Sequence, residues 1–154
     1  MQAWRFLELK FIVGVVCLGS IIVLALFGGL VAGHDPNEQN LLFALEPPFG
    51  PEGGYLLGTD HLGRDLLARM TSGARVSLAI AGSVVVLSGV VGVLVGALSG
   101  YLSGTRDILI QKVVETFWAF PPILLAIAIL AFFGPSLTNV IIALTIQRWI
   151  PYCR

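Results

Sequence analysis

Residues 11–30 read FIVGVVCLGSIIVLALFGGL, twenty residues without a charge. A helix rises about 1.5 Å per residue, so this stretch is long enough to cross the roughly 30 Å hydrocarbon core of a bilayer. A secretory signal peptide is the alternative, since Arg5 and Lys10 precede the stretch and Val31-Ala32-Gly33 loosely resembles a cleavage site. The apolar run exceeds the roughly 7 to 15 residues of a signal-peptide core. We therefore predict an uncleaved transmembrane helix.

The composition of the whole chain agrees with a membrane protein. Of its 154 residues 56% are hydrophobic and only 12% are charged, more apolar side chain than a soluble domain of this size can bury. Nine Lys and Arg balance nine Asp and Glu, so no basic field favours nucleic acid as a partner. Cys17 and Cys153 lie far apart and are interpreted as free thiols. The sequence predicts an all-α membrane protein.

Residues 31–75 differ from the flanking segments, because their prolines and glycines prevent a continuous helix. They are predicted to form an extramembrane loop with a short amphipathic helix near 65–72 at the membrane interface. Asp65 and Arg69 are four residues apart on its polar face, and Asp60 or Thr59 is expected to cap it or a preceding turn. Three further apolar runs predict helices at about 76–102, 108–133 and 137–150, which gives four transmembrane helices in total.

The placement of lysine and arginine predicts the orientation, because these residues favour the cytoplasmic side of a membrane. With the N-terminus inside, six lie at the inner flanks and three in the first loop. Residues 1–10 are therefore predicted to be cytoplasmic and residues 31–75 extracytoplasmic. The inner residues are Arg5, Lys10, Arg106, Lys112, Arg148 and Arg154, and those of the loop are Arg64, Arg69 and Arg75.

Small residues recur every four positions in the second predicted helix. They share one face and allow another backbone to approach closely, which predicts a packing seam in a helix bundle. The alternative is that membrane helices are simply rich in glycine. The residues concerned are Ser88, Gly92, Gly96 and Gly100.

Two consecutive prolines lie near the middle of the third predicted helix. Pro121 and Pro122 remove two backbone donors and free the carbonyls of Phe117 and Trp118, so a kink is expected. In hydrocarbon these carbonyls need protein partners or a water-lined cavity, which makes the four residues a candidate pathway or hinge. A fixed bend without a role in transport is the alternative.

No catalytic, cofactor or metal site is predicted. Gly58 and Gly63 have the spacing of a phosphate-binding loop, but Arg64-Asp65 stands where Lys and Ser/Thr are required. His61 and Asp65 supply too few ligands for a metal and are interpreted as a surface polar pair. Within the predicted helices only Lys112 and Glu115 come near to an ionisable cluster, and an enzyme is not expected.

Several motifs together resemble a known family. LGTDHLGRD at 57–65 is followed by GARVSL at 73–78, Gly100-Tyr101, Ala119-Phe120-Pro121 and Leu124–Ile127. In this order they resemble the C-type permeases of dipeptide, oligopeptide and nickel ABC importers, from about residue 57 to the last residue. The motif residues of the outer loop are Gly58, Thr59, Asp60, Gly63, Arg64, Asp65 and Arg75.

The resemblance implies a type I ABC importer permease in a bacterial inner membrane, forming half of a translocation pathway for peptides. It further implies a homologous second permease, two cytoplasmic ATPases that bind ATP and Mg²⁺, and an extracytoplasmic substrate-binding protein. Nickel is the alternative substrate. This chain would itself hold no cofactor and perform no bond chemistry.

Members of that family continue beyond the position of Trp149–Arg154 into a cytoplasmic coupling segment with a Glu-Ala-Ala-type motif and then into further helices. Residues 76–154 are therefore expected to be a truncated type-1 transmembrane domain, incomplete at the C-terminus. The alternative function is that of a fragment with a structural or assembly role, which packs through its glycine seam and transports nothing.

Overall fold

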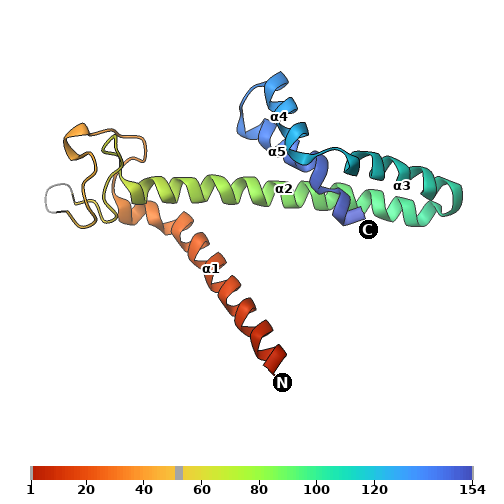
Figure 1. The fold of residues 1–154 in the computed structure, drawn as a ribbon, viewed down its shortest axis with the longest axis horizontal. Coiled ribbons are helices and arrows are strands. Elements are labelled where there is room, and N and C mark those ends of the chain that lie inside the picture. Colours follow the sequence, from red (N-terminus) through yellow and green to blue (C-terminus); the bar gives the residue numbers. More distant parts are fainter. Residues whose placement is uncertain (1, 51–53, 154) are drawn as a thin grey trace. The chain divides into compact units, whose positions relative to one another are not determined.

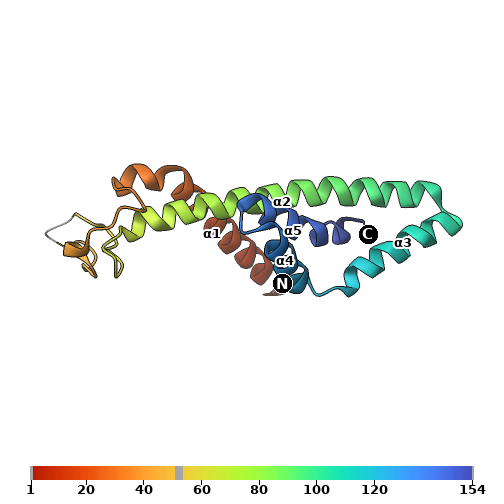
Figure 2. The same ribbon diagram turned by 90° about the horizontal axis from the view of Figure 1, so that it is seen from above.

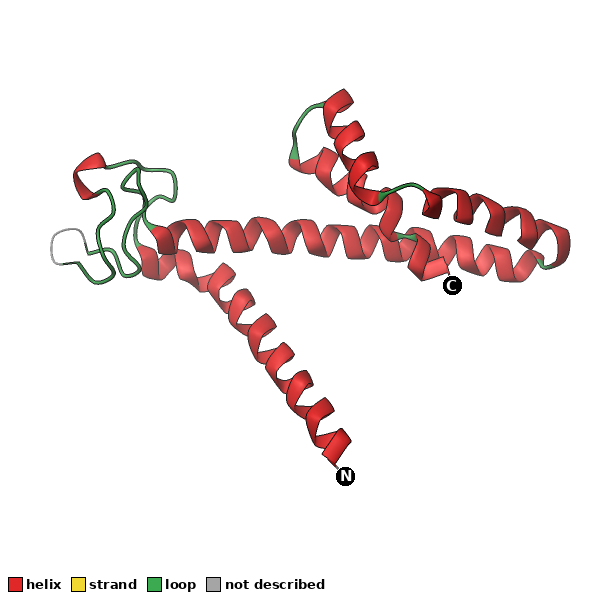
Figure 3. Ribbon diagram, viewed as in Figure 1, coloured by secondary structure: helices red, strands yellow, loops and turns green. Residues whose placement is uncertain are grey.

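The computed structural model describes residues 2–50 and 54–153, with side chains from residue 9 onward. Four residues of the charge count, Arg5, Glu8, Glu52 and Arg154, lie outside the described side chains. The described residues are helices and loops without a strand (Figures 1 and 3), which confirms the all-α prediction. The α-helices are α1 (Gln2–Ala32), α2 (Leu66–Leu102), α3 (Gly104–Ala119), α4 (Pro122–Phe133) and α5 (Leu137–Arg148), and the short 3-10 helices are η1 (Leu41–Phe43) and η2 (Ile150–Cys153).

Two of these helices are long and apolar enough to cross a membrane, α1 over Leu9–Ala32 and α2 over Leu66–Leu102. A third candidate is the pair α3 and α4, whose axes differ by 80° at the break between them. The described part of the chain thus has two membrane-spanning candidates, or three if the bent pair is one span. The predicted fourth region forms α5, whose 12 residues are fewer than the roughly 20 of a full span.

The chain divides into two compact units, Met1–Leu78 and Ala79–Arg154. In the first unit the C-terminal end of α1 and the first turns of α2 lie side by side (Figures 1 and 2). Ala32 is buried there against Leu67 and Ala68. A Cβ atom at Gly28 would overlap the methyl group of Thr71, so glycine allows the two helices to approach closely.

The interfacial helix predicted near 65–72 is not a separate element, because it forms the first turns of α2. Gly73 does not interrupt the helix: a single glycine costs about 1 kcal/mol, which a helix of 37 residues tolerates. Leu67 and Ala68 are buried, whereas Leu66 and Met70 are exposed.

In the second unit α4 packs against α5, and a three-residue turn joins them. Gly134 adopts φ +84°, and Ser136 caps α5 by accepting a hydrogen bond from the Asn139 amide at 3.1 Å. The Asn139 side chain donates to the carbonyls of Phe133 and Gly134 at 3.0 and 2.8 Å. The turn therefore satisfies its own backbone, as a turn between apolar helices must.

The contact of α1 with α2 predicts a position-dependent effect of adding side chains to α1. Gly28→Leu should force the helices apart at Thr71, at a cost of about 1–3 kcal/mol. Disulfide formation between cysteines introduced at Ala32 and Leu67 should then fall strongly. Gly19→Leu is the matched control, because nothing lies within 4 Å of a Cβ at Gly19. Equal disulfide yields in both variants would contradict this contact.

Candidate functional site

The outer-loop motif, residues 57–65, folds into a closed turn. The Asp60 amide donates to the Arg64 carbonyl at 3.0 Å, and the Gly63 amide donates to the Asp60 carbonyl at 2.9 Å. Gly63 adopts φ +70° and Gly58 φ +77°, a region in which glycine is favoured. The two glycines of the motif are thus required by the backbone.

Asp60 lies at the centre of this turn. Its Oδ1 atom accepts hydrogen bonds from the amides of Leu62 and Arg64 at 2.8 and 3.1 Å. Its Oδ2 atom accepts from Arg64 Nε at 2.8 Å and from Arg69 Nη1. Burial raises the pKa of the Asp60 carboxyl, but these hydrogen bonds outweigh burial and hold the pKa well below its ordinary value. Arg69 therefore pairs with Asp60 and not with Asp65, which lies four residues before it.

Asp65 joins the two helices of the first unit. Its Oδ1 atom caps α2 by accepting from the amides of Leu67 and Ala68 at 2.8 and 3.2 Å. Its Oδ2 atom shares a hydrogen bond of 2.9 Å with Nδ1 of His34, a residue that follows α1. Asp60 or Thr59 was expected to cap this helix or a preceding turn. Asp65 caps the helix, and Asp60 caps the preceding turn.

The predicted pair of His61 and Asp65 is not formed, because the Asp65 carboxylate is 2% exposed and faces His34. His61 is exposed. The His34 ring lies 4.7 Å from the ring of Tyr55. Among the described side chains, those of residues 9–50 and 54–153, no three His, Cys, Asp or Glu lie close enough together to hold a metal ion.

Thr59 attaches the motif to the preceding segment 40–50. Its hydroxyl donates to the Phe43 carbonyl and accepts from the Glu46 amide at 2.9 Å, and its own amide donates to the Glu46 carbonyl at 3.1 Å. Cβ atoms at Gly58 and Gly63 would overlap the carbonyls of Glu46 and Asn40. The motif residues thus hold segment 40–50 through close backbone contact.

Arg75 reaches from α2 to α1. Its Nε atom donates to the Ala25 carbonyl, and its Nη2 atom lies 3.5 Å from the Leu26 carbonyl. A Cβ at Gly29 would lie 2.9 Å from Nη2. This motif residue therefore contributes to the contact of the two helices.

The structure brings part of the predicted packing seam together. Ser88 is fully buried, and Cβ atoms at Gly92 and Gly96 would collide with the backbone of Trp149 and Cys153. Nothing lies within 4 Å of a Cβ at Gly100, so this residue lies outside the contact. The segment that follows α5 therefore packs against the seam of α2.

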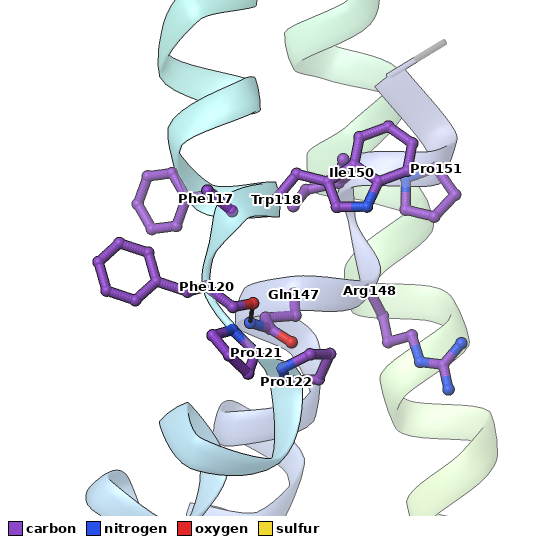
Figure 4. Close-up of a pocket in the computed structure, with 10 residues that line it drawn as sticks. Phe117, Trp118, Phe120, Pro121, Pro122, Gln147, Arg148, Ile150 and Pro151 are labelled. Atoms are coloured by element: carbon purple, nitrogen blue, oxygen red, sulfur yellow. Dashed lines mark hydrogen bonds between the residues drawn. The ribbon is translucent and has the colours of Figure 1, made fainter.

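A cleft of about 420 Å³ lies at the break between α3 and α4 (Figure 4). We call it the proline cleft. All four residues of the predicted pathway or hinge line it. Its walls are formed by Phe117, Trp118, Ala119, Phe120, Pro121, Pro122, Gln147, Arg148, Ile150 and Pro151.

Two backbone carbonyls at this break accept hydrogen bonds that the sequence did not predict. The Phe117 carbonyl, which the prolines release from the helical pattern, accepts from the Phe120 amide at 3.4 Å. The Phe120 carbonyl accepts from the Gln147 side chain at 3.0 Å, and Figure 4 shows the two groups facing each other beside Pro121. Arg148 points away from this pair (Figure 4). The cleft therefore combines aromatic walls with polar groups from the end of α5.

The sequence interpretation missed three residues of these sites. Gln147 is an amide at the end of the apolar run of α5, and this signal could have indicated a partner in a neighbouring break. His34 and Asn40 gave no local signal, because their partners Asp65 and Gly63 lie more than twenty residues away in the chain.

Comparisons with known proteins agree with the motif resemblance. The family profile described as the N-terminal TM domain of oligopeptide transport permease C matches residues 10–48. The di/tripeptide transport system permease protein DppC of Pseudomonas aeruginosa (strain UCBPP-PA14) is 44% identical over 92% of this chain and 48% of its own length. The oligopeptide transport system permease protein OppC of Bacillus subtilis (strain 168) is 32% identical over 100% of this chain and 52% of its own length. The chain spans about half the length of the curated relatives that it matches.

Close backbone contact at Gly63 predicts a large effect of a single methyl group. Gly63→Ala combines a disfavoured φ with overlap at the Asn40 carbonyl, and should destabilise the loop by about 1–3 kcal/mol. Hydrogen exchange of the Leu66 amide, which donates to the Gly58 carbonyl, should accelerate. Gly54→Ala is the matched control, with φ +69° but nothing within 4 Å of the added Cβ. Similar exchange rates in both variants would show that the contact with Asn40 is unimportant.

The lowered pKa of Asp60 predicts how the loop responds to acid. Stability from a carboxylate with a depressed pKa is complete above its unfolded value of about 3.9 and is lost as pH falls toward the folded value. Amide protection in residues 58–66 should therefore be constant from neutral pH down to about pH 4 and decline below it. Asp60→Asn should lower protection already at pH 7 and remove the Asp60 part of the acid response. An unchanged pH profile in this variant would refute the role of Asp60.

Proposed function

Because the chain belongs to the C-type permease family of peptide transport systems, we propose that it forms part of the membrane pathway of a binding-protein-dependent peptide importer. The observation that carries this proposal is the proline cleft. It opens where a membrane-spanning candidate breaks by 80°, and it is lined by the four residues at which a break was predicted. A broken helix in a bilayer requires protein or water at the freed backbone, as a pathway provides.

The chemistry of the proline cleft suits a peptide. Its aromatic and proline walls offer apolar contact to varied side chains, and Gln147 and Arg148 add polar groups to the lining. A peptide carries backbone amides and a carboxylate, which match such groups. Neither the apolar walls nor the polar groups are specific for one side chain, as a transporter of many peptides requires.

Transport needs two states of the pathway, open to either side of the membrane in turn. Energy from ATP reaches a permease only if its partners contact the two states differently. We place ATP and Mg²⁺ on two cytoplasmic ATPase subunits, and a second, homologous permease on the other side of the pathway. In this arrangement an extracytoplasmic binding protein delivers the peptide and the chain performs no bond chemistry.

The proposed location is a bacterial inner membrane, with residues 1–10 cytoplasmic and the loop that contains the outer-loop motif outside. The distribution of lysine and arginine supports this orientation. It places the outer-loop motif on the side from which a binding protein delivers substrate.

Uptake into proteoliposomes tests the proposal. A complex containing this chain should import labelled dipeptide in the presence of ATP. Uptake of Ni²⁺, measured in parallel, tests the alternative substrate. The double substitution Pro121→Ala and Pro122→Ala should lower dipeptide uptake about tenfold or more, because the break can then close into a regular helix. Pro135→Ala, at an exposed turn residue, is the control and should retain uptake. Full uptake by the double variant, or import of Ni²⁺ without peptide, would contradict the proposal.

A further inference from the structure

Four large apolar side chains project from segment 40–50, and we call them the apolar tip. Leu41 is 70% exposed, Leu42 91%, Leu45 73% and Phe49 77%. The segment belongs to the loop between α1 and α2. Exposed apolar groups gathered on one short segment mark an interaction site more often than isolated ones do.

The backbone holds two of these side chains in unfavourable conformations. Leu45 has φ 59° and Phe49 φ 56°, a region that bulky residues seldom adopt. The Leu45 amide donates to the Asp60 carbonyl at 3.1 Å, and the Phe49 amide donates to the Tyr55 carbonyl at 3.1 Å. Such strain persists only where the surrounding structure enforces it, and it is concentrated at functional sites.

Another part of the same segment faces inward, and the four residues of the apolar tip do not belong to it. Phe43 lies 6.0 Å from Tyr55, ring to ring, and Tyr55 is only 7% exposed. Thr59 binds the Phe43 carbonyl from within the motif. The loop thus buries Tyr55 against the half-buried Phe43 and leaves Leu41, Leu42, Leu45 and Phe49 exposed.

Carboxylates accompany the apolar tip. Asp35 and Glu38 are exposed. Burial and then the charges of Glu38, Asp65 and Glu46 raise the pKa of Tyr55, so these carboxylates lie near the ring that contacts Phe43. Both arginines of the described loop residues, Arg64 and Arg69, bind one carboxylate, Asp60. Over residues 33–50 and 54–69 five carboxylates therefore stand against two arginines. The surroundings of the tip are therefore acidic.

Two occupants of the tip are disfavoured by these observations. The tip segment lies beyond the adjoining ends of α1 and α2 in both views (Figures 1 and 2), so the hydrocarbon spanned by these helices does not reach it. A second copy of the chain would bring acidic surroundings against acidic surroundings, which is repulsive. A soluble protein with the opposite charge has neither difficulty.

We propose that the apolar tip is a docking surface for an extracytoplasmic protein that offers an apolar hollow rimmed by Lys or Arg. This inference rests on the proposed function, in which that partner is the binding protein that delivers the peptide. The proposal also assigns a role to the outer-loop motif. Gly58, Thr59, Asp60 and Gly63 hold the backbone that presents the tip.

The test measures binding of the purified binding protein of the same transport system to the complete membrane complex in lipid nanodiscs. The double substitution Leu42→Ser and Phe49→Ser should weaken binding at least tenfold, because apolar anchors at the centre of an interface carry most of its affinity. Asp35→Asn with Glu38→Gln should lower the association rate severalfold and reduce its salt dependence. Tyr101→Ser is the control, since Tyr101 is 86% exposed in the other unit.

Hydrogen exchange of the Gly63 amide should be unchanged in every variant, which shows that the loop remains folded. Unchanged binding by the Leu42 and Phe49 variant would overturn the proposal. Normal binding with a loss of contact to lipid vesicles, or with a change in oligomeric state, would also overturn it and would identify the membrane or a second copy as the occupant. If the unsubstituted complex imports peptide, these failures concern docking alone; if it does not, the proposed function itself is wrong.

Discussion

Every backbone amide and carbonyl of an apolar chain needs a hydrogen-bond partner where a helix stops, because lipid supplies none. Side chains meet this need at each break described above. Asp65 caps α2 and binds His34, Ser136 and Asn139 close the turn before α5, and Gln147 reaches the Phe120 carbonyl across the proline break. These polar residues therefore lie where the helices end, and the same places are the candidate sites.

The two candidate sites use this constraint differently. In the outer loop the hydrogen bonds of Asp60 and Thr59 produce a rigid turn, which can present a surface to a partner in water. At the proline break the partners leave a cleft of about 420 Å³, which is large enough for small ligands. A rigid surface suits the recognition of a partner protein. A cleft at a helix break suits the passage of a substrate or a change in the angle between the two helices.

The sequence predicted the apolar helices, the polar loop and the break at Pro121-Pro122, because all three follow from composition and from the missing proline donors. It did not predict which carboxylate caps α2 or which arginine Asp60 binds. Those choices depend on contacts between residues distant in the chain, such as Gly63 with Asn40, and periodicity carries no information about them. The prediction of a separate helix near 65–72 differs from the structure for a related reason. An amphipathic pattern and an apolar run can share one continuous helix, as they do in α2.

The central claim is that the proline cleft lies on the path of the peptide, and thiol accessibility tests it most directly. In the complete complex, with Cys17 and Cys153 replaced by serine, Phe120→Cys should react with a membrane-impermeant thiol reagent, and a transported dipeptide should slow the reaction. Leu98→Cys, at an exposed apolar position of α2, should stay unreactive under both conditions. A Phe120→Cys variant as unreactive as Leu98→Cys, or one whose reaction ignores the dipeptide, would contradict the claim.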